Sequence, residues 1–333
     1  MIGNETKKGK YAMKILIDGC GYIGEIHLRS LCQIRQCDIA LCDIDPRRLA
    51  EISARYGIAE TYLSLAEALK HSMDGVVICT PNHKHRDDLV QCVKAGINVM
   101  LEKPMSDSAE SAGEMLAICR QYNRFAFVAY CLRFANTYIQ IKQLIDSGTL
   151  GKVFDIHASV AGKKAITDAR SDFRMKKALG GGVISDFSHE IDYCLWFSGK
   201  PVRQVFCSGL RAVHKDWDVQ DTADIILVCQ DDVNLTIHMD FLQPFSGRSL
   251  EICGTLGSIR WRDTEKPKIY LEGRNQWEEL DIVTDYEQMY RDEMLHYIDC
   301  LKTGRQPAVD AEAGFTVMKI IDACVKMAES QEE

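Results

Sequence analysis

A glycine-rich stretch near the start of the chain is the first segment that could do chemistry. Three glycines follow the apolar run 14–18 with the spacing G-x-G-x-x-G, and a helical pattern begins after them. If the run is a strand, Gly19 permits a tight turn, Gly21 lets the backbone approach a pyrophosphate, and Gly24 lets the helix lie close to the strand. The N–H groups at the helix start would then favour phosphate oxygens. The spacing predicts a dinucleotide site.

An acidic residue at a suitable distance supports this interpretation. The apolar run 38–42 ends at Asp43, which lies 19 positions after Gly24. A carboxylate at the end of the second strand takes the ribose hydroxyls of NAD, and it repels the 2′-phosphate of NADP. Arg47 and Arg48 follow closely and could reach a phosphate. We nevertheless expect NAD rather than NADP as the cofactor.

A turn after the apolar run 75–79 is a second place where a cofactor could lie. Its residues of interest are Thr80, Pro81, Asn82, His83 and His85. Proline and asparagine are common turn formers, so the segment could simply end a strand. The histidines could also reach a cofactor.

Glu102-Lys103-Pro104 follows the apolar run 97–101. Ligands of open α/β sheets bind at the carboxyl ends of the strands. A lysine there can hydrogen-bond a substrate hydroxyl or help hold a proton-transfer group. An ordinary exposed loop lysine is the alternative.

A glycine triplet, Gly180–Gly182, leads into a predicted helix with Asp186, His189 and Asp192 at three-residue steps. These positions share roughly one helical face. Histidine is the usual proton-transfer residue near neutral pH, and a neighbouring carboxylate can orient it. An amphipathic helix with a solvated polar face is the alternative. No second histidine follows at the step of a zinc motif, so we expect no metal.

The segment 163–177, just before the glycine triplet, is basic. It includes Arg170, Arg174, Lys176 and Lys177. It is either a solvated loop or a clamp for an anionic group of the substrate.

The pattern of elements changes near residue 130. Strands alternate with helices over 13–130, which predicts a parallel sheet with both faces covered. Successive β-like runs over 202–273 predict a mostly antiparallel sheet. We therefore expect a disordered leader at 1–12, a cofactor domain at 13–130, and a substrate-binding and oligomerisation domain at 131–333. Two further helices are expected at about 285–303 and 311–329.

Composition limits the partners. The net charge is −8 and no basic stripe occurs, so we expect no nucleic-acid partner. No run of about 18 apolar residues occurs, so we expect no membrane span. The 14 cysteines lie within apolar runs without a C-x-x-C motif, and the N-terminus lacks an apolar signal core. We therefore expect a cytoplasmic protein with reduced thiols.

Together these motifs resemble the Gfo/Idh/MocA family, named for glucose–fructose oxidoreductase and inositol dehydrogenase. The resemblance covers residues 13–330 and rests on Gly19–Gly24, Cys79–His83, Glu102–Pro104, the segment 180–192 and Met289–Glu293. It implies an N-terminal Rossmann domain and a C-terminal α/β domain with a large open sheet. Family members commonly use that sheet to form dimers or tetramers. It also implies an NAD(P)-dependent reaction at a carbinol carbon of a sugar or cyclitol.

The resemblance also implies roles for single residues. Lys103 matches the family's EKP lysine, His189 its active-site histidine and Asp186 its nearby aspartate. The common pattern has three residues between the aspartate and the histidine, whereas two intervene here. The form DFSHEID resembles a subgroup often found with sugar-nucleotide or surface-polysaccharide genes. Asp192 could replace Asp186 as the supporting carboxylate.

The predicted activity is hydride transfer between NAD and a sugar, nucleotide sugar or cyclitol. His189 would take the hydroxyl proton, and Lys103 would hydrogen-bond the same oxygen. Two alternatives stay open: an NAD-dependent glycosidase with transient redox, and an NAD-binding regulator without turnover. Cofactor contacts are expected from Gly19, Gly21, Tyr22, Ile23, Gly24, Asp43, Thr80, Pro81, Asn82, His85, Glu102 and Lys103. Substrate contacts are expected from Arg170, Arg174 and Asp192.

Overall fold

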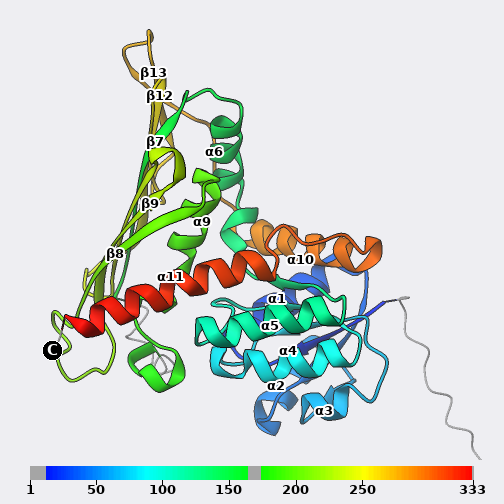
Figure 1. Ribbon diagram of the computed structural model, residues 1–333. Helices are drawn as coiled ribbons and strands as arrows, with labels where there is room; N and C mark the ends of the chain where they lie inside the picture. Colours follow the sequence, from blue (N-terminus) through cyan, green and yellow to red (C-terminus); the bar gives the residue numbers. More distant parts are fainter. Residues whose placement is uncertain (1–12, 164–173, 332–333) are drawn as a thin grey trace, which may run out of the picture. The chain divides into compact units, whose positions relative to one another are not determined.

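The structure is a computed structural model that describes residues 13–163 and 174–331 (Figure 1). The predicted leader and Arg170 lie outside the described residues. The chain divides into two compact units. The first comprises Met1–Glu102, Gly113–Ala129 and Tyr290–Ala311; the second comprises Lys103–Ala112, Tyr130–Met289 and Glu312–Glu333. The boundary at residue 130 stays a prediction.

The first unit contains a six-stranded sheet in the order β3-β2-β1-β4-β5-β6. Its strands are β1 Lys14–Asp18, β2 Asp38–Cys42, β3 Thr61–Tyr62, β4 Gly75–Ile78, β5 Asn98–Leu101 and β6 Ala126–Val128. Every pairing is parallel. This is the strand order of a doubly wound dinucleotide-binding sheet, with the order reversing between β1 and β4. The predicted parallel sheet is confirmed.

Helices follow the strands in turn. They are α1 Tyr22–Ile34, α2 Pro46–Tyr56, α3 Leu65–Ala68, α4 His85–Lys94, α5 Ala109–Gln121 and α10 Tyr286–Thr303. Helix α2 illustrates how local sequence sets the bounds. The Asp45 carboxylate accepts the N–H groups of Arg47 and Arg48, Pro46 occupies the first turn, and Gly57 ends the helix with φ 69°. A cap of this kind contributes about 0.5–2 kcal/mol.

Tyr297 on α10 explains why a C-terminal segment belongs to the first unit. The Val76 N–H donates to its hydroxyl at 3.1 Å, and the hydroxyl donates to the Asn98 carbonyl at 2.9 Å. A Cβ at Gly75 would lie 2.6 Å from this hydroxyl. The tyrosine is therefore anchored between neighbouring strands β4 and β5.

The second unit contains an eight-stranded sheet in the order β14-β13-β12-β11-β7-β10-β9-β8. The strands are β7 Val153–Gly162, β8 Val202–Leu210, β9 Thr222–Cys229, β10 Asn234–Asp240, β11 Ser246–Gly254, β12 Gly257–Arg262, β13 Lys268–Leu271 and β14 Trp277–Glu279. The pairing is antiparallel except between β7 and β10. The predicted mostly antiparallel sheet is confirmed. The short strand β14 and the parallel pair were not predicted.

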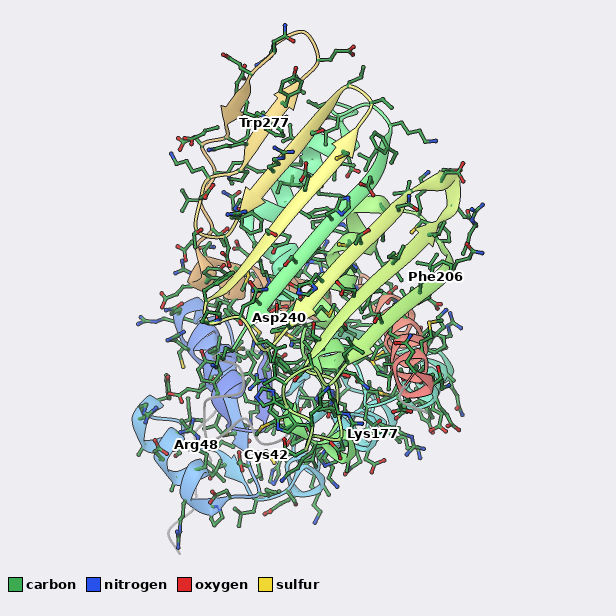
Figure 2. The ribbon with its side chains drawn as sticks, turned by 90° about the vertical axis from the view of Figure 1, so that its left-hand side faces the viewer. Cys42, Arg48, Lys177, Phe206, Asp240 and Trp277 are labelled. Carbon is green, nitrogen blue, oxygen red and sulfur yellow. The ribbon has the colours of Figure 1, made fainter. Side chains whose placement is uncertain are left out.

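The two faces of this sheet differ. Ile156, Ala158 and Val160 of β7 are buried on one face, where α6 (Asn136–Asp146) and α9 (Ser188–Ser198) lie (Figure 1). Alternate residues point to the other face because side chains in a strand alternate. Figure 2 looks onto that other face, which no helix of the described chain covers. Helix α11, Ala311–Ser330, closes the chain.

All 14 cysteines carry free thiols. Within residues 13–163 and 174–331, no helix combines the length and the apolar character needed to cross a membrane.

Candidate active site

The glycine-rich loop of the first unit connects β1 to α1. Gly19 has φ +97°, and a Cβ there would lie 2.8 Å from the Cys79 carbonyl carbon. A Cβ at Gly24 would lie 1.9 Å from the Gly19 carbonyl oxygen, whereas one at Gly21 would meet no described atom within 4 Å. The fold itself therefore requires Gly19 and Gly24, while Gly21 leaves open space at the surface.

The start of α1 fits a pyrophosphate. Gly21 is the N-terminal cap residue, and it forms no side-chain cap within the described chain. Tyr22, which follows it, is 70% exposed. The N–H groups of a first helical turn and the helix dipole favour an anion at this position. With the open space at Gly21, the loop has the shape and polarity that NAD needs.

Asp43 follows β2, close to this loop. Its carboxylate accepts the Cys20 N–H at 2.7 Å and the Asp45 N–H at 2.8 Å. Two backbone donors, one on each oxygen, hold the group in one orientation. A carboxylate oxygen accepts more than one hydrogen bond, so Asp43 can still accept ribose hydroxyls.

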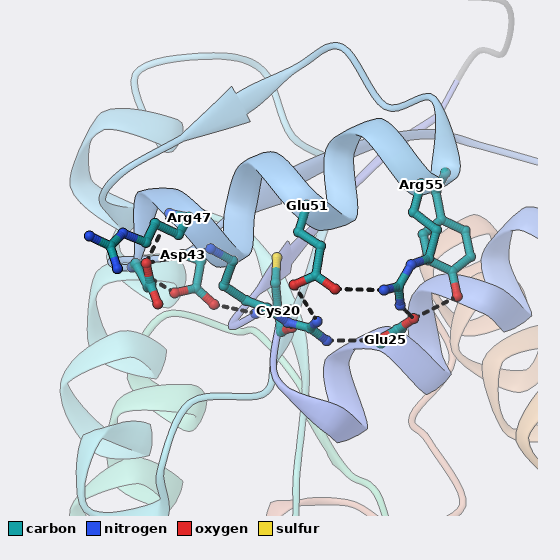
Figure 3. A network of polar contacts seen from close by, with 9 residues as sticks. Cys20, Glu25, Asp43, Arg47, Glu51 and Arg55 are labelled. Carbon is teal, nitrogen blue, oxygen red and sulfur yellow. Dashed lines mark hydrogen bonds and ion pairs between the residues drawn. The ribbon is translucent and has the colours of Figure 1, made fainter.

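Arg48 forms hydrogen bonds with Cys20, Glu25 and Glu51, residues that Figure 3 labels in a network beside the loop. Its Nε donates to the Cys20 carbonyl at 2.7 Å, and its Nη atoms donate to Glu25 at 2.6 Å and Glu51 at 3.1 Å. Burial alone would raise the pKa of Glu25, but hydrogen bonds from Arg48, Arg55 and Tyr56 outweigh it and lower that pKa. Arg48 therefore braces the loop backbone rather than pointing at a 2′-phosphate.

Asp18, the last residue of β1, was not singled out from the sequence. It is 5% exposed, and its Oδ2 has no hydrogen-bond partner in the described part of the chain. Burial, with a smaller effect of Asp88, raises the pKa of Asp18 to about 7. The sequence could have indicated a buried acid here, because Asp18 ends an otherwise apolar run.

The turn after β4 is fixed by its own side chains. The Thr80 hydroxyl donates to Asp88 at 2.7 Å, and His85 Nε2 lies 2.9 Å from the Thr80 carbonyl oxygen. His85 is 1% exposed, so it stabilises the turn from the buried side. Pro81 is exposed and Asn82 begins a short 3₁₀ turn. Farther along, Glu102 Oε1 lies 2.6 Å from His27 Nε2.

In the second unit, the predicted single helix after the glycine triplet is wrong. The structure has a short helix α8, Val183–Asp186, and a separate helix α9, Ser188–Ser198. Phe187 separates them with ψ 31°, and its ring lies 5.1 Å from the ring of Phe241. Asp186 therefore does not share a helical face with His189 and Asp192.

Lys103 and Arg174 both bind Asp186, through different atoms. Lys103 Nζ donates to the backbone carbonyl of Asp186 at 2.7 Å. Arg174 Nε donates to its carboxylate at 2.9 Å. The break after α8 exposes this carbonyl to the lysine, because the carbonyls at a helix end lack partners within the helix. The contact ties the Lys103 ammonium to a position three residues before His189.

His189 is buried and neutral. It is 9% exposed, and the Tyr130 ring packs against it at 5.5 Å with an interplanar angle of 81°. Its Nε2 lies 4.0 Å from Cys131 Sγ. Burial, with Lys103 and then Arg248, lowers the pKa of His189 well below 6.5. The imidazole is therefore unprotonated at neutral pH, which is the form that a general base requires.

No carboxylate orients His189 within the described residues, although the sequence led us to expect one. Both oxygens of Asp192 accept hydrogen bonds from Arg133, at 2.9 and 2.6 Å. His189 Nδ1 is buried without a hydrogen-bond partner among the described groups. The Asp186 carboxylate is bound by Arg174 instead.

A buried ion pair lies next to the histidine in sequence and was also missed. Glu190 is fully buried, and Arg248 Nε donates to it at 2.7 Å. Burial raises the pKa of Glu190 despite Arg248. The sequence did indicate that Arg248 points inward. Side chains in a strand alternate between faces, and Arg248 lies two and four positions before the buried Leu250 and Ile252.

No group of three or more His, Cys, Asp or Glu side chains in the described ranges could hold a metal ion.

Comparison with known families identifies both halves of the chain. Residues 13–130 match the family described as "Oxidoreductase family, NAD-binding Rossmann fold". Residues 138–260 match the "GFO/IDH/MocA C-terminal domain".

Individual relatives cover nearly the full chain. The chain is 24% identical over 314 residues to "Myo-inositol 2-dehydrogenase" of Thermotoga maritima, covering 91% of this chain and 92% of that protein. An oxidoreductase from Agrobacterium radiobacter, solved with NAD⁺, L-tartaric acid and magnesium, has a TM-score of 0.86 at 20% identity and covers 96% of this chain and 97% of its own. The WlbA dehydrogenase of Bordetella pertussis, solved with NADH and UDP-GlcNAcA, has a TM-score of 0.83 at 22% identity, with 97% of both chains covered.

Proposed function

Since this chain belongs to the Gfo/Idh/MocA family of NAD(P)-dependent oxidoreductases, we propose that it transfers a hydride between NAD and the carbinol carbon of a sugar, nucleotide sugar or cyclitol. The observation that carries the proposal is that the second unit holds a fixed cation, Lys103, in the environment of a neutral base, His189. Lys103 Nζ is held 2.7 Å from the Asp186 carbonyl, and its charge helps to lower the pKa of buried His189.

The roles of the residues follow from their charges. When bound, NAD supplies the hydride acceptor. The Lys103 ammonium hydrogen-bonds the substrate oxygen and stabilises the negative charge that develops on it. The neutral imidazole of His189 takes the hydroxyl proton, which is general base catalysis. In the reverse direction, the protonated imidazole returns that proton to the carbonyl oxygen.

We infer a preference for NAD over NADP from Asp43 and Arg48. The Asp43 carboxylate is oriented by two backbone N–H groups, and its charge would repel a 2′-phosphate. Arg48, which could otherwise compensate, is engaged by Glu25, Glu51 and the Cys20 carbonyl.

The substrate class rests on the relatives and on the basic segment before α8. The relative from Thermotoga maritima acts on myo-inositol by its name, and the WlbA structure contains a nucleotide sugar. Arg174, with Arg170, would hold an anionic group of the substrate. Loss of Arg174 should raise KM more than it lowers kcat, because such a contact acts in the ground and transition states alike.

We also propose that the protein works in the cytoplasm as a homodimer or homotetramer. The free thiols support a reducing compartment, because oxidising compartments favour disulfides. The uncovered sheet face supports association, since Phe206 and Ile226 are 52% and 44% exposed and lie opposite each other on β8 and β9. Light scattering of wild type and Phe206→Asp tests this point.

The experiment that tests the activity follows NADH absorbance with a panel of sugars, cyclitols and nucleotide sugars. Net accumulation of NADH with at least one member is expected. Lys94→Ala, at the exposed end of α4, is the control and should keep the wild-type rate. Substrate cleavage without net NADH would support the glycosidase instead, and tight NAD binding without any turnover across the panel would support a regulator.

A further inference from the structure

Helix α11 lies alongside β8, the edge strand of the large sheet, as Figures 1 and 2 both show. A Cβ at Gly209 on β8 would lie 2.7 Å from the Ala328 Cβ on α11. Gln331 Nε2 donates to the Cys207 carbonyl of β8 at 2.8 Å. The side chain of Gln331 thus satisfies a carbonyl of the edge strand, and helix and strand approach closely along the contact.

Two thiols face each other across this contact. Cys207 and Gly209 are two residues apart on the strand, so they share a face. Cys324 and Ala328 are four residues apart on the helix, so they also share a face. Because Ala328 lies against Gly209, Cys324 is directed at the same face of β8. The two thiols lie close enough for Cys324 to lower the pKa of the Cys207 thiol.

We propose that Cys207 and Cys324 form a reversible disulfide when the protein meets a hydroperoxide, which makes the pair an oxidation site that joins β8 to α11. Both thiols are free in the structure, and both residues are buried, at 7% and 0% exposure. Cys207 keeps a small exposed fraction, so a small hydroperoxide is a better oxidant for the pair than a large disulfide reagent.

Cys207 is the residue that reacts first. The neighbouring Cys324 thiol lowers the pKa of the Cys207 thiol despite burial, whereas the pKa of Cys324 is raised. The Cys207 thiolate attacks one peroxide oxygen, the O–O bond breaks, and Cys207 becomes a sulfenic acid while hydroxide leaves. Cys324 then displaces the sulfenic oxygen as water and the S–S bond forms. Each sulfur loses one electron, and the peroxide gains two.

The disulfide would fix a helix that supports the catalytic segment. Glu329 on α11 forms an ion pair with Lys177, three residues before the glycine triplet. Asp322 on α11 accepts the Ala109 N–H at 3.0 Å. Oxidation should therefore protect α11 and the segment after Lys177 from local opening, which hydrogen exchange measures.

The test treats the full-length reduced protein with hydrogen peroxide, blocks the remaining thiols, and maps non-reduced peptides by mass spectrometry. We expect a Cys207–Cys324 linked peptide that lacks two hydrogen atoms and disappears after treatment with dithiothreitol. The melting temperature should rise on oxidation. In Cys324→Ser, Cys207 should instead be trapped as a sulfenic acid by dimedone, and the melting temperature should not rise.

Cys253 provides the matched control. It is more exposed than either partner, and it lies on β11, opposite Asp155 of the central strand β7. Cys253→Ser should leave the cross-link unchanged. The proposal is overturned if wild type yields oxidised Cys253 but no Cys207–Cys324 peptide, or if Cys207 pairs with another cysteine. Both outcomes are measured on wild type, so they do not depend on the variants folding.

Discussion

The two units prepare their chemistry in opposite ways. In the first, the loop between β1 and α1 uses backbone: a Cβ at Gly24 would overlap the Gly19 carbonyl at 1.9 Å, and one at Gly21 would meet only open space. In the second, the segment around α8 and α9 uses buried charge, with Lys103 and Arg174 both bound to Asp186. Backbone shape depends on residues near in sequence, whereas buried charge depends on partners far apart in sequence.

The largest effect is expected from substitutions in the glycine-rich loop of the first unit. Gly24→Ala should abolish NAD binding and lower the melting temperature even without cofactor, because the new Cβ clashes with the protein itself. Gly21→Ala should leave the melting temperature of the free protein unchanged and weaken NAD binding, because its Cβ would meet only the cofactor. Thermal unfolding and calorimetry measure the two effects. Equal destabilisation of the free protein by both variants would contradict this division.

The next effect concerns the buried acid beneath the loop. The pKa of Asp18 is raised from 3.8 to about 7, so the folded state keeps a proton that the unfolded state loses above pH 3.8. Stability contributed by this proton is present below pH 3.8 and is lost as the pH rises to about 7, by on the order of 4 kcal/mol.

Asp18→Asn should remove this loss. Its advantage over wild type in the free energy of unfolding should grow from pH 4 to pH 7 and then stay constant. Urea unfolding across this range measures it, with the exposed Asp74→Asn as control. An advantage that does not vary with pH would mean that Asp18 does not titrate as the burial argument requires.

A smaller effect is expected for cofactor choice. Asp43→Ala should weaken NAD about ten- to a hundredfold, the range for losing a hydrogen bond to a charged group. The affinity for NADP should change less, so the preference should narrow. Calorimetric titration of both cofactors decides it, and tighter binding of NADP by wild type would reverse the interpretation of Asp43 and Arg48.

The smallest effect concerns the buried charges of the second unit and is a change in the pKa of His189. Burial is the main cause of the low pKa of His189, and Lys103 is the second. Lys103→Met should therefore raise that pKa only part of the way toward 6.5. An NMR titration of the imidazole protons measures it without substrate. An unchanged pKa would remove Lys103 from the environment of His189.

These differences explain how far the sequence alone could predict the molecule. The parallel sheet and the mostly antiparallel sheet follow from alternating elements and successive strand runs, which are local patterns. The glycine spacing and Asp43 are also local. The parallel pairing of β7 with β10 was not predictable, because the chain between them forms other strands and helices first.

The partners of charged residues were the least predictable part. Nothing near Asp192 in sequence indicates Arg133, which lies 59 positions away. The break at Phe187 depends on a ring contact with Phe241 of the sheet, so helical periodicity alone placed Asp186 on the wrong face. Arg248 was detectable from strand parity, but its partner Glu190 was not.

The measurement that tests the central claim most directly is the turnover of His189→Ala, Lys103→Ala and the double variant. Loss of a general acid–base group lowers kcat by about 10²–10⁴, and the double variant should be little worse than the poorer single variant because the two residues act as a unit. The affinity for NAD should be unchanged in all three. A His189→Ala protein that binds NAD normally and turns over its substrate at nearly the wild-type rate would contradict the account.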